Sequence, residues 1–226
     1  MSIVRDKSPV TLVGGAAVPE GDLARALALA PRLVAADGGA DRALALGREP
    51  VAVIGDLDSI TPSARARLAD RLQEIAEQDS TDFDKALRSI DAPLVLALGV
   101  AGGRFDHEMA AMNVLCRHPD RPCIVIGAES LVFLTPPDVT IGLAAGESIG
   151  LFPMAPLRAS SEGLEWPTDG LMLAPTGRIA TSNRATGPVR LRPDAPALLT
   201  ILSAERLEPA VRALARSARW PARAAR

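Results

Sequence analysis

The fold is decided by residues 32–67, which read RLVAADGGADRALALGREPVAVIGDLDSITPSARAR. Two apolar runs within this stretch, residues 32–36 and 51–54, have the length and composition of buried strands. A helical pattern over residues 41–46 separates them and stops at Gly47, the residue type favoured just after a helix. Continuous apolar strands that alternate with helices predict a parallel sheet covered by helices on both faces.

The same alternation extends beyond this stretch. Thr61 and Pro62 have the residue types of an N-cap and a first helical position, so another helix is expected to begin there. Further strands are predicted at residues 9–13, 94–98 and 123–126, and further helices at residues 21–30, 82–90 and 105–116. We therefore expect an α/β domain over residues 1–128.

The pattern changes after residue 128. Short apolar runs then follow one another about every 8–12 residues, separated by Gly, Pro and Asp. They cover residues 130–134, 147–152, 171–173, 178–181, 188–191 and 198–202. This spacing predicts an antiparallel β-sandwich or barrel over residues 129–226, ending in an Ala/Arg-rich tail from residue 204 that forms a helix or a frayed end.

The composition argues against several classes of protein. Of the 226 residues, 48% are hydrophobic and 23% charged, which is typical of globular rather than disordered chains. A net charge of -2 and an aromatic content of 3% argue against a nucleic-acid-binding surface. Two cysteines and two histidines form no zinc or disulfide pattern. No apolar run reaches the roughly 20 residues of a membrane span and the first residues lack the apolar core of a signal peptide, so we expect a soluble cytoplasmic protein.

Carboxylates follow most strands of the predicted parallel sheet. They are Asp37, Asp56, Asp58, Asp79, Asp82 and Asp106. Because ligands of open α/β sheets bind outside the carboxyl ends of the strands, we expect these side chains to converge on one crevice. Two unit charges ~4 Å apart repel by about 4 kcal/mol at an effective dielectric constant of ~20, so such a cluster needs protonation or a cation. Oxygen ligands without His or Cys favour Mg²⁺.

Glycine pairs and basic side chains accompany these carboxylates. The pairs follow predicted strands at Gly14-Gly15, Gly38-Gly39 and Gly102-Gly103. Glycine lets backbone N–H groups approach an anion closely, and the last pair opens a helix whose N-terminus favours phosphate. Arg104 offers a planar fork for phosphate oxygens, and Lys85 lies about one helical turn after Asp82. Together these residues predict a polyphosphate site with a divalent cation.

Each of these features also has a commonplace explanation. A lone Gly-Gly pair is more often a turn than a phosphate loop, and a lone Asp after a strand is an N-cap as often as a ligand. Lys85 alone would be a solvated lysine, and His107 beside Asp106 is more often structural than catalytic. The functional interpretation depends on the recurrence of such loops at the same end of successive strands.

Ordered motifs point to one family. They are Ala36-Asp37-Gly38-Gly39-Ala40, Gly55-Asp56-Leu57-Asp58-Ser59-Ile60, Gln78-Asp79-Ser80-Thr81-Asp82-Phe83-Asp84-Lys85-Ala86-Leu87, Gly102-Gly103-Arg104-Phe105-Asp106-His107, Glu162-Gly163-Leu164-Glu165-Trp166 and Thr181-Ser182-Asn183. From about residue 10 to about residue 200, the chain resembles the thiamine pyrophosphokinase family. It departs from the family pattern at Glu77, where the family often has Asp, and in the residues after Asn183.

The resemblance implies transfer of pyrophosphate from ATP to the hydroxyl of thiamine, which gives thiamine diphosphate and AMP and depends on Mg²⁺. It implies a Rossmann-like nucleotide-binding catalytic domain followed by a β-sandwich domain for thiamine binding and dimerisation. It also implies a homodimer whose sites are shared between subunits. The expected metal ligands are Asp56, Asp58, Asp79 and Asp106. The residues expected near ATP are Gly14, Gly15, Asp37, Gly38, Ser80, Thr81, Asp82, Lys85, Gly102 and Gly103. The residues expected near thiamine, on the other subunit, are Trp166, Ser182 and Asn183.

The expected mechanism is attack of the thiamine hydroxyl on the β-phosphorus of ATP, with AMP as the leaving group. Lys85 and Arg104 neutralise charge together with Mg²⁺, and Asp82, in preference to Asp106, accepts the hydroxyl proton. Trp166 stacks on thiamine through a cation–π contact, with core packing as the alternative role.

Other functions stay open. A Mg²⁺-dependent phosphohydrolase would use the same aspartates with water as the acceptor, and a sensor would bind ATP and thiamine without turnover. A dinucleotide oxidoreductase is disfavoured because no Gly-x-Gly-x-x-Gly follows the first predicted strand.

Overall fold

The chain divides into two units in the computed structural model, which describes residues 2–223. The first unit comprises Met1–Val114 and Val125–Gly127, and the second comprises Leu115–Ile124 and Ala128–Arg226. The division is therefore not the single cut at residue 128 that the sequence predicts, because the segment 115–124 packs with the second unit. Residues 224–226 of the Arg-rich tail lie outside the described residues.

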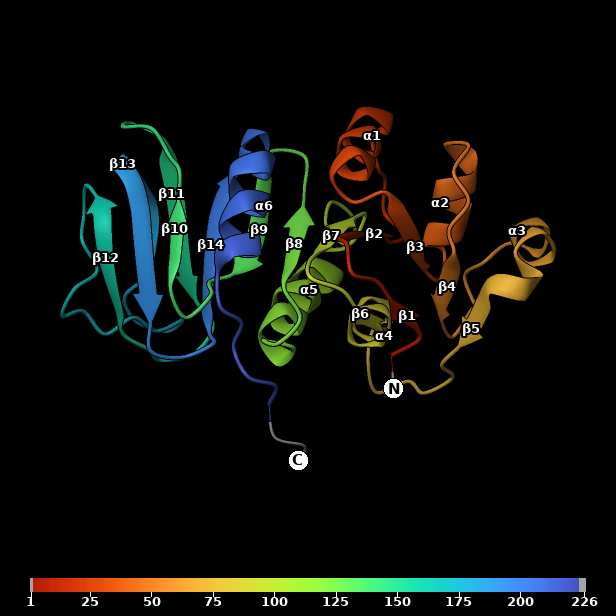
Figure 1. The fold of residues 1–226 in the computed structure, drawn as a ribbon. Coiled ribbons are helices and arrows are strands. Elements are labelled where there is room, and N and C mark those ends of the chain that lie inside the picture. The colour runs from red at the N-terminus through yellow and green to blue at the C-terminus, as the bar shows by residue number, and fades with distance from the viewer. Residues whose placement is uncertain (1, 224–226) are drawn as a thin grey trace. The chain divides into compact units, whose positions relative to one another are not determined.

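A parallel sheet forms the centre of the first unit. Its strands are β2 (Val10–Val13), β3 (Arg32–Ala36), β4 (Ala52–Gly55), β5 (Leu72–Glu74) and β7 (Val95–Leu98). They pair in the order β7-β2-β3-β4-β5 (Figure 1). The chain runs from β2 outward to β5 and then returns to β7 on the other side of β2. The loops after β2 and β7 therefore diverge at a topological switch point, where open α/β sheets bind ligands.

The helices of the first unit follow the predicted positions closely. They are α1 (Glu20–Leu29), α2 (Gly39–Ala45), α3 (Pro62–Arg67), α4 (Asp82–Ser89) and α5 (Phe105–Arg117), with a 3-10 turn η1 at Ala69–Arg71; the last three residues of α5 belong to the second unit. All residues of β2, β4 and β7 are buried. Since successive side chains of a strand point to opposite faces, both faces of the sheet are covered, as the apolar strands predict.

Local signals fix the helix ends. Gly47 ends the region of α2 with a left-handed φ of 68°, as predicted for a glycine after a helix. The Thr61 hydroxyl accepts the backbone N–H of Ala64 at 3.3 Å, with Pro62 at the first helical position, so the predicted N-cap of α3 is confirmed. Thr81 caps α4 in the same way by accepting the N–H of Asp84.

Gly39 determines how closely α2 approaches β2. A Cβ atom built on Gly39 would lie 2.0 Å from the carbonyl oxygen of Val13, and both partners are backbone that cannot move aside cheaply. We expect Gly39→Ala to lower the free energy of unfolding by about 3 kcal/mol or more, through overpacking. Chemical denaturation measures this loss. Gly21→Ala in α1 is the control, because no atom lies within 4 Å of its added methyl group; an equal loss in both variants would contradict the packing argument.

The second unit is antiparallel. Its strands are β9 (Ser130–Leu134), β10 (Val139–Ile141), β11 (Ser148–Pro153), β12 (Ala159–Leu164), β13 (Ala180–Pro193) and β14 (Leu198–Ser203). The first part of β13 pairs with β11, which continues to β14 and β9, while its second part pairs with β10 and β12. The long strand β13 thus takes part in two groups of strands, an arrangement that fits the expected β-sandwich.

A helix closes the second unit. After a 3-10 turn η2 (Ala204–Arg206), α6 (Leu207–Arg216) buries Leu207, Ala210 and Leu214 on one face and contacts β10. The Ala/Arg-rich segment from residue 204 therefore begins as a helix rather than as a frayed end. The remaining strand β8 (Cys123–Ile126) contains the division between the two units.

Several sequence predictions differ from the structure. Residues 171–173 form only an isolated bridge between Leu173 and Leu157, not a strand. The runs 178–181 and 188–191 are not two separate strands. Residues 178–179 precede β13 and the rest belongs to it, because the residues between the two runs, Gly187 among them, continue the extended chain. The sequence analysis also missed β5, β10 and β12, which are short or polar, and the two-residue pair of β1 (Val4–Arg5) with β6 (Ile90–Asp91).

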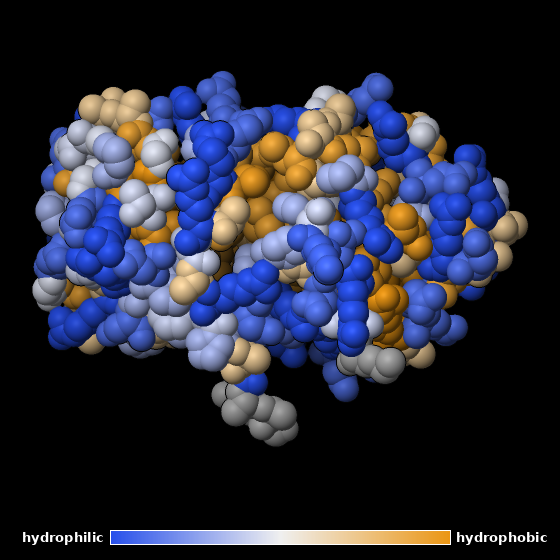
Figure 2. Space-filling model, in the orientation of Figure 1, coloured by the Kyte–Doolittle hydropathy of each residue, from blue (hydrophilic) through white to orange (hydrophobic). Residues whose placement is uncertain are grey.

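The surface is chemically mixed. Figure 2 shows hydrophilic and hydrophobic residues interspersed on the visible face of both units. Within residues 2–223, no helix is both long and apolar enough to cross a membrane.

Candidate active site

A cleft of about 1010 Å³ opens in the first unit at the carboxyl ends of the parallel strands. Loops after β2, β3, β4 and β7 line it, together with the start of α4. The predicted site residues that line it are Gly14, Gly15, Asp37, Gly38, Asp56, Asp58, Ser80, Thr81, Asp82, Gly103 and Arg104. Asp79, Lys85, Gly102 and Asp106 are not among the lining residues. The crevice expected at this end of the sheet is thus present, with most of its predicted residues.

Three carboxylates gather on one side of the cleft. One oxygen from each of Asp37, Asp56 and Asp58 lies within 4.8 Å of the other two, which is a spacing suited to a shared cation. Leu57 makes this possible, because its φ of 64° turns the chain while its side chain stays buried. Within residues 2–223, the predicted ligands Asp79 and Asp106 do not belong to this group, whereas Asp37, expected near ATP, does.

The environment of Asp37 fits a cation. The residue is only 4% exposed, and its Oδ1 atom is buried without a hydrogen-bond partner. Burial is the main reason why the pKa of Asp37 is raised, and the neighbouring charges of Asp82 and Asp58 raise it further. A Cβ on Gly55 would lie 2.9 Å from both Asp37 and Asp82, so glycine is needed there for the two carboxylates to approach. A buried charge with an unsatisfied oxygen is stabilised when a cation binds it.

Lys85 lies beneath the carboxylates as a buried counter-charge. It is 1% exposed, and its Nζ donates to Asp56 Oδ2 at 3.0 Å and to Asp82 Oδ1 at 3.1 Å. Burial alone lowers the pKa of the ammonium group, but the hydrogen bonds to Asp56 and Asp82 outweigh that effect and raise the pKa. Burial likewise raises the pKa of Asp56, and its hydrogen bonds from Lys85 and Gln78 reverse the shift, so the net pKa is lowered. The two shifts therefore favour the charged form of both groups, the ammonium of Lys85 and the carboxylate of Asp56.

The segment that opens α5 is arranged differently from the prediction. Arg104 was expected to bind phosphate, but its Nε and Nη2 donate to Asp106 at 3.1 and 2.5 Å. This pairing is the main cause of the lowered pKa of Asp106. The N–H of Gly102, expected to face phosphate, donates to Glu108 at 2.8 Å. A ligand that binds the N–H of Gly102 must therefore displace Glu108, and one that binds Arg104 meets a guanidinium already paired with Asp106.

Sequence reasoning missed functional residues beside the carboxylates. Gln78 donates from Nε2 to Asp56 Oδ2 at 3.0 Å, and its place directly before Asp79 in the quoted motif is the signal that could have found it. Arg42 lines the cleft and donates to the carbonyl of Gly15 at 3.0 Å, which ties α2 to the loop after β2.

Glu77 was noted only as a departure from a family pattern. Its carboxylate accepts a hydrogen bond from Ser80, which lowers the pKa of Glu77 most, and one from Arg88, which lowers it further. Together they bring this pKa to about 2. The Glu77-x-x-Ser80 spacing ahead of the Thr81 N-cap is the sequence signal for this local arrangement.

The predicted thiamine residues lie on the second unit. Trp166 follows β12 and is 54% exposed, so it is not a core residue. Asn183 is 4% exposed, and its amide donates to the carbonyl of Trp166 at 2.7 Å and accepts the N–H groups of Trp166 and Arg184. Ser182 has a left-handed φ of 58° and is exposed. The side chain of Asn183 therefore fixes the backbone of Trp166, whereas Trp166 and Ser182 present free surface to a ligand.

Comparisons show what this chain is similar to. Residues 23–126 match the family model described as thiamin pyrophosphokinase, catalytic domain. Thiamine pyrophosphokinase 3 of Oryza sativa subsp. japonica is 33% identical over 196 residues, which cover 68% of this chain and 73% of the relative. Thiamine pyrophosphokinase 1 of the same plant is 31% identical over 185 residues, with 66% and 70% covered.

A similar fold is found among solved structures. The thiamin pyrophosphokinase from Candida albicans superposes with a TM-score of 0.72 at 18% identity, over 88% of this chain and 92% of that chain. The yeast thiamin pyrophosphokinase gives a TM-score of 0.72 at 19% identity, over 92% of this chain and 93% of that chain. At this level of sequence identity, the superpositions show a shared fold and nothing more.

Proposed function

The chain belongs to the thiamine pyrophosphokinase family, and from this premise we propose how its own residues carry out the reaction. The function is ATP-dependent formation of thiamine diphosphate. We place ATP in the cleft of the first unit, with its phosphates over the loops after β2 and β7. One observation carries this placement: an oxygen of Asp37 lies within 4.8 Å of oxygens of Asp56 and Asp58, in loops at the carboxyl ends of β3 and β4 that line the cleft.

In this proposal Asp37, Asp56 and Asp58 hold Mg²⁺, which when bound neutralises phosphate charge. The donor set supports this choice, because it consists of oxygens alone. Lys85 keeps Asp56 ionised and fixes its orientation through the 3.0 Å hydrogen bond. The role expected for Asp79 and Asp106 as ligands has less support than that of Asp37, because neither lies in the group of three.

Asp82 is the proposed acceptor of the thiamine hydroxyl proton. It lines the cleft, and Lys85 and the N–H of Asp56 hold only its Oδ1 atom in place. Asp106 is the weaker candidate, because Arg104 binds both of its oxygens. The proton acceptor has to reach the hydroxyl in the bound complex, and Asp82 offers a carboxylate at the cleft wall for that purpose. The hydroxyl then attacks the β-phosphorus, and AMP leaves.

Product analysis tests this function directly. The chain is incubated with ATP, Mg²⁺ and thiamine, and the products are identified by mass spectrometry. We expect thiamine diphosphate and AMP in equal amounts. Release of inorganic phosphate without thiamine diphosphate would show a phosphohydrolase, and binding without any product would show a sensor.

Trp166 is the proposed stacking surface for thiamine. A cation–π contact with Trp contributes about 0.5–2 kcal/mol, so we expect Trp166→Ala to raise the KM for thiamine by about 2- to 30-fold. The KM for ATP is expected to stay near the wild-type value, because Trp166 lies on the other unit from the ATP cleft. Steady-state kinetics with each substrate varied in turn measure both constants. An unchanged KM for thiamine would reject the stacking role.

We propose further that the protein works as a homodimer in which the cleft of one subunit is completed by Trp166 and Ser182 of the other. This proposal rests on the family resemblance and on the location of these residues on different units. Mixing the Asp56→Asn/Asp58→Asn variant with the Trp166→Ala variant is expected to restore activity at low thiamine concentration, after subunit exchange. Failure of the mixture to exceed the two separate variants would show that each site is built within one subunit. A cytoplasmic location is a prediction from the sequence.

A further inference from the structure

A clamp of charged residues holds the loop that precedes α4. The Oε2 atom of Glu77 accepts the backbone N–H groups of Asp79 and Ser80 at 2.7 and 3.1 Å. Its Oε1 atom accepts the Ser80 hydroxyl and the Nη2 group of Arg88, the latter at 2.7 Å. Arg88 also donates from Nη1 to the Ser80 hydroxyl at 3.1 Å. Two residues of this loop, Glu77 and Ser80, are thus tied to one guanidinium group.

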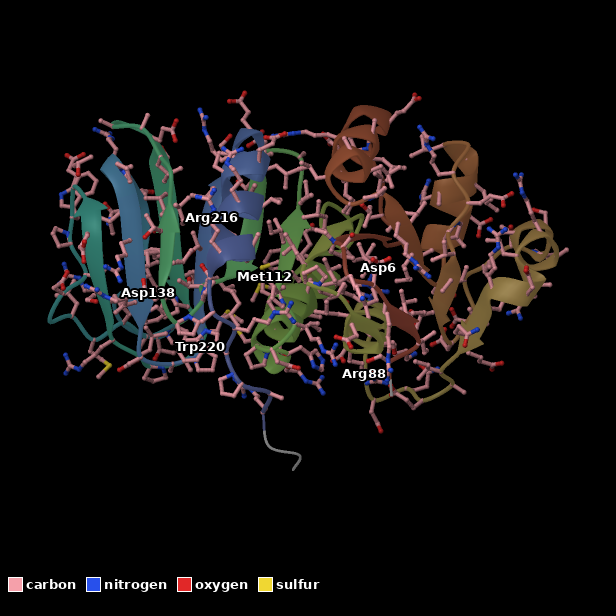
Figure 3. All side chains as sticks on the ribbon, viewed as in Figure 1. Asp6, Arg88, Met112, Asp138, Arg216 and Trp220 are labelled. Atoms are coloured by element: carbon pink, nitrogen blue, oxygen red, sulfur yellow. The ribbon has the colours of Figure 1, made fainter. Side chains whose placement is uncertain are left out.

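Arg88 in turn is anchored to the helix. It extends from the last turn of α4, where it is labelled in Figure 3. Its Nη1 lies 3.5 Å from the carboxylate of Asp84, one turn earlier in the same helix, and Asp84 is fully buried. The clamp therefore joins a surface loop to a helix that packs on β3 and β4.

The clamped loop carries Gln78, which reaches the proposed metal site. Gln78 donates to Asp56 Oδ2 at 3.0 Å, the same oxygen that Lys85 binds at 3.0 Å. Lys85 approaches from α4 and Gln78 from the loop, so both elements joined by Arg88 place one donor on Asp56. With Oδ2 bound from two sides, the rotation of the Asp56 carboxylate is fixed. Groups that orient a metal ligand in this way change metal affinity without touching the metal.

We propose that Glu77 and Arg88 are positioning residues that, through Gln78, set the carboxylate of Asp56 for binding a divalent cation. This inference rests on the proposed function, in which Asp56 is a metal ligand. An ordinary exposed ion pair contributes little to stability and has no effect on a distant ligand. The Glu77–Arg88 pair differs because each partner also binds Ser80, and because the loop between them carries Gln78.

Direct titration of the full chain with Mn²⁺, followed by electron paramagnetic resonance, tests the proposal without turnover. We expect Glu77→Gln, Arg88→Gln and Gln78→Met each to weaken Mn²⁺ binding by about 10- to 100-fold. The Glu77→Gln/Arg88→Gln double variant is expected to bind no more weakly than either single variant, because the clamp acts as one unit. Unchanged Mn²⁺ affinity in these variants, or absence of Mn²⁺ binding by the wild type, would overturn the proposal.

Matched controls separate positioning from general loss of structure. Arg67→Gln removes another Arg–Glu ion pair of 2.7 Å, with Glu49, and neither residue lines the cleft. Its Mn²⁺ affinity is expected to equal that of the wild type. Gln78 is exposed, so Gln78→Met is expected to leave the fold intact. It therefore tests the hydrogen bond from Gln78 to Asp56 even if a Glu77 or Arg88 variant unfolds.

Kinetics give a second measurement of the same clamp. For Arg88→Gln, the Mg²⁺ concentration needed for half-maximal activity is expected to rise while the KM for thiamine stays constant. A raised KM for thiamine with unchanged Mg²⁺ dependence would contradict positioning of Asp56. A wild type that binds Mn²⁺ but makes no thiamine diphosphate would overturn the proposed function and leave the clamp intact. If the wild type is active and its clamp variants bind Mn²⁺ with normal affinity, the clamp proposal is wrong and the proposed function stands.

Discussion

Asp56→Asn combined with Asp58→Asn is expected to reduce formation of AMP and thiamine diphosphate by about a thousandfold or more, because it removes several kcal/mol of charge stabilisation at the phosphates. Each amide keeps the shape of the carboxylate but loses its charge. Of the group of three, only Asp37 then keeps its carboxyl group. Initial rates at saturating ATP and thiamine measure the loss.

Two controls accompany this double variant. Its far-ultraviolet circular dichroism is expected to match the wild type, since Asp58 is exposed and Lys85 keeps its hydrogen bond to Asp82 when Asp56 loses its charge. Asp70→Asn removes a carboxylate that is 83% exposed and remote from the cleft lining, so its rate is expected to stay normal. Turnover near the wild-type rate in the double variant would remove the metal-binding role of these two aspartates.

Lys85→Met is expected to produce a large loss of stability. The substitution leaves Asp56 and Asp82 facing one another without the cation that both bind. Removal of one partner from a buried ion pair costs about 3–5 kcal/mol, and the partial exposure of Asp82 favours the lower end of that range. Chemical denaturation, followed by far-ultraviolet circular dichroism, measures the change. Activity is expected to fall as well, because Asp56 loses one of the two donors that orient it.

A second substitution checks the cause. Adding Asp82→Asn to Lys85→Met removes one of the two unpaired carboxylates and is expected to restore part of the lost stability. Lys7→Met is the control, since it replaces the only other lysine of the chain, which is exposed. A Lys85→Met variant as stable as Lys7→Met would mean that the buried ion pair contributes nothing to the fold.

The first unit follows from the sequence because its local signals agree with each other. The apolar runs of β3 and β4, the Thr61–Pro62 start of α3 and Gly47 after α2 each indicate the same alternation of strand and helix. β5 (Leu72–Glu74) was missed because this strand at the edge of the sheet is short and partly polar. In the second unit, a break was expected before the run 188–191, where Gly187 stands, yet β13 stays extended there, since pairing with neighbouring strands overrides the local preference.

The sequence predicts the type of site, but not which side chains within it pair with one another. Carboxylates after successive strands indicate a common crevice, and Asp37, Asp56 and Asp58 do meet there. The sequence cannot show which carboxylates are taken by internal partners. Asp106 pairs with Arg104, and Glu108 occupies the N–H of Gly102, because both lie within one turn of the same helix start. Likewise, the burial of Lys85 depends on packing of α4 against β3 and β4, which spacing alone does not reveal.

The position of the cation is the central claim, and anomalous diffraction from crystals grown with Mn²⁺ and a non-hydrolysable ATP analogue measures it most directly. The account predicts an anomalous peak coordinated by oxygens of Asp37, Asp56 and Asp58, with the analogue's phosphates in the same cleft. A peak held by Asp79 and Asp106 instead, or phosphates bound away from the loops after β2 and β7, would contradict it.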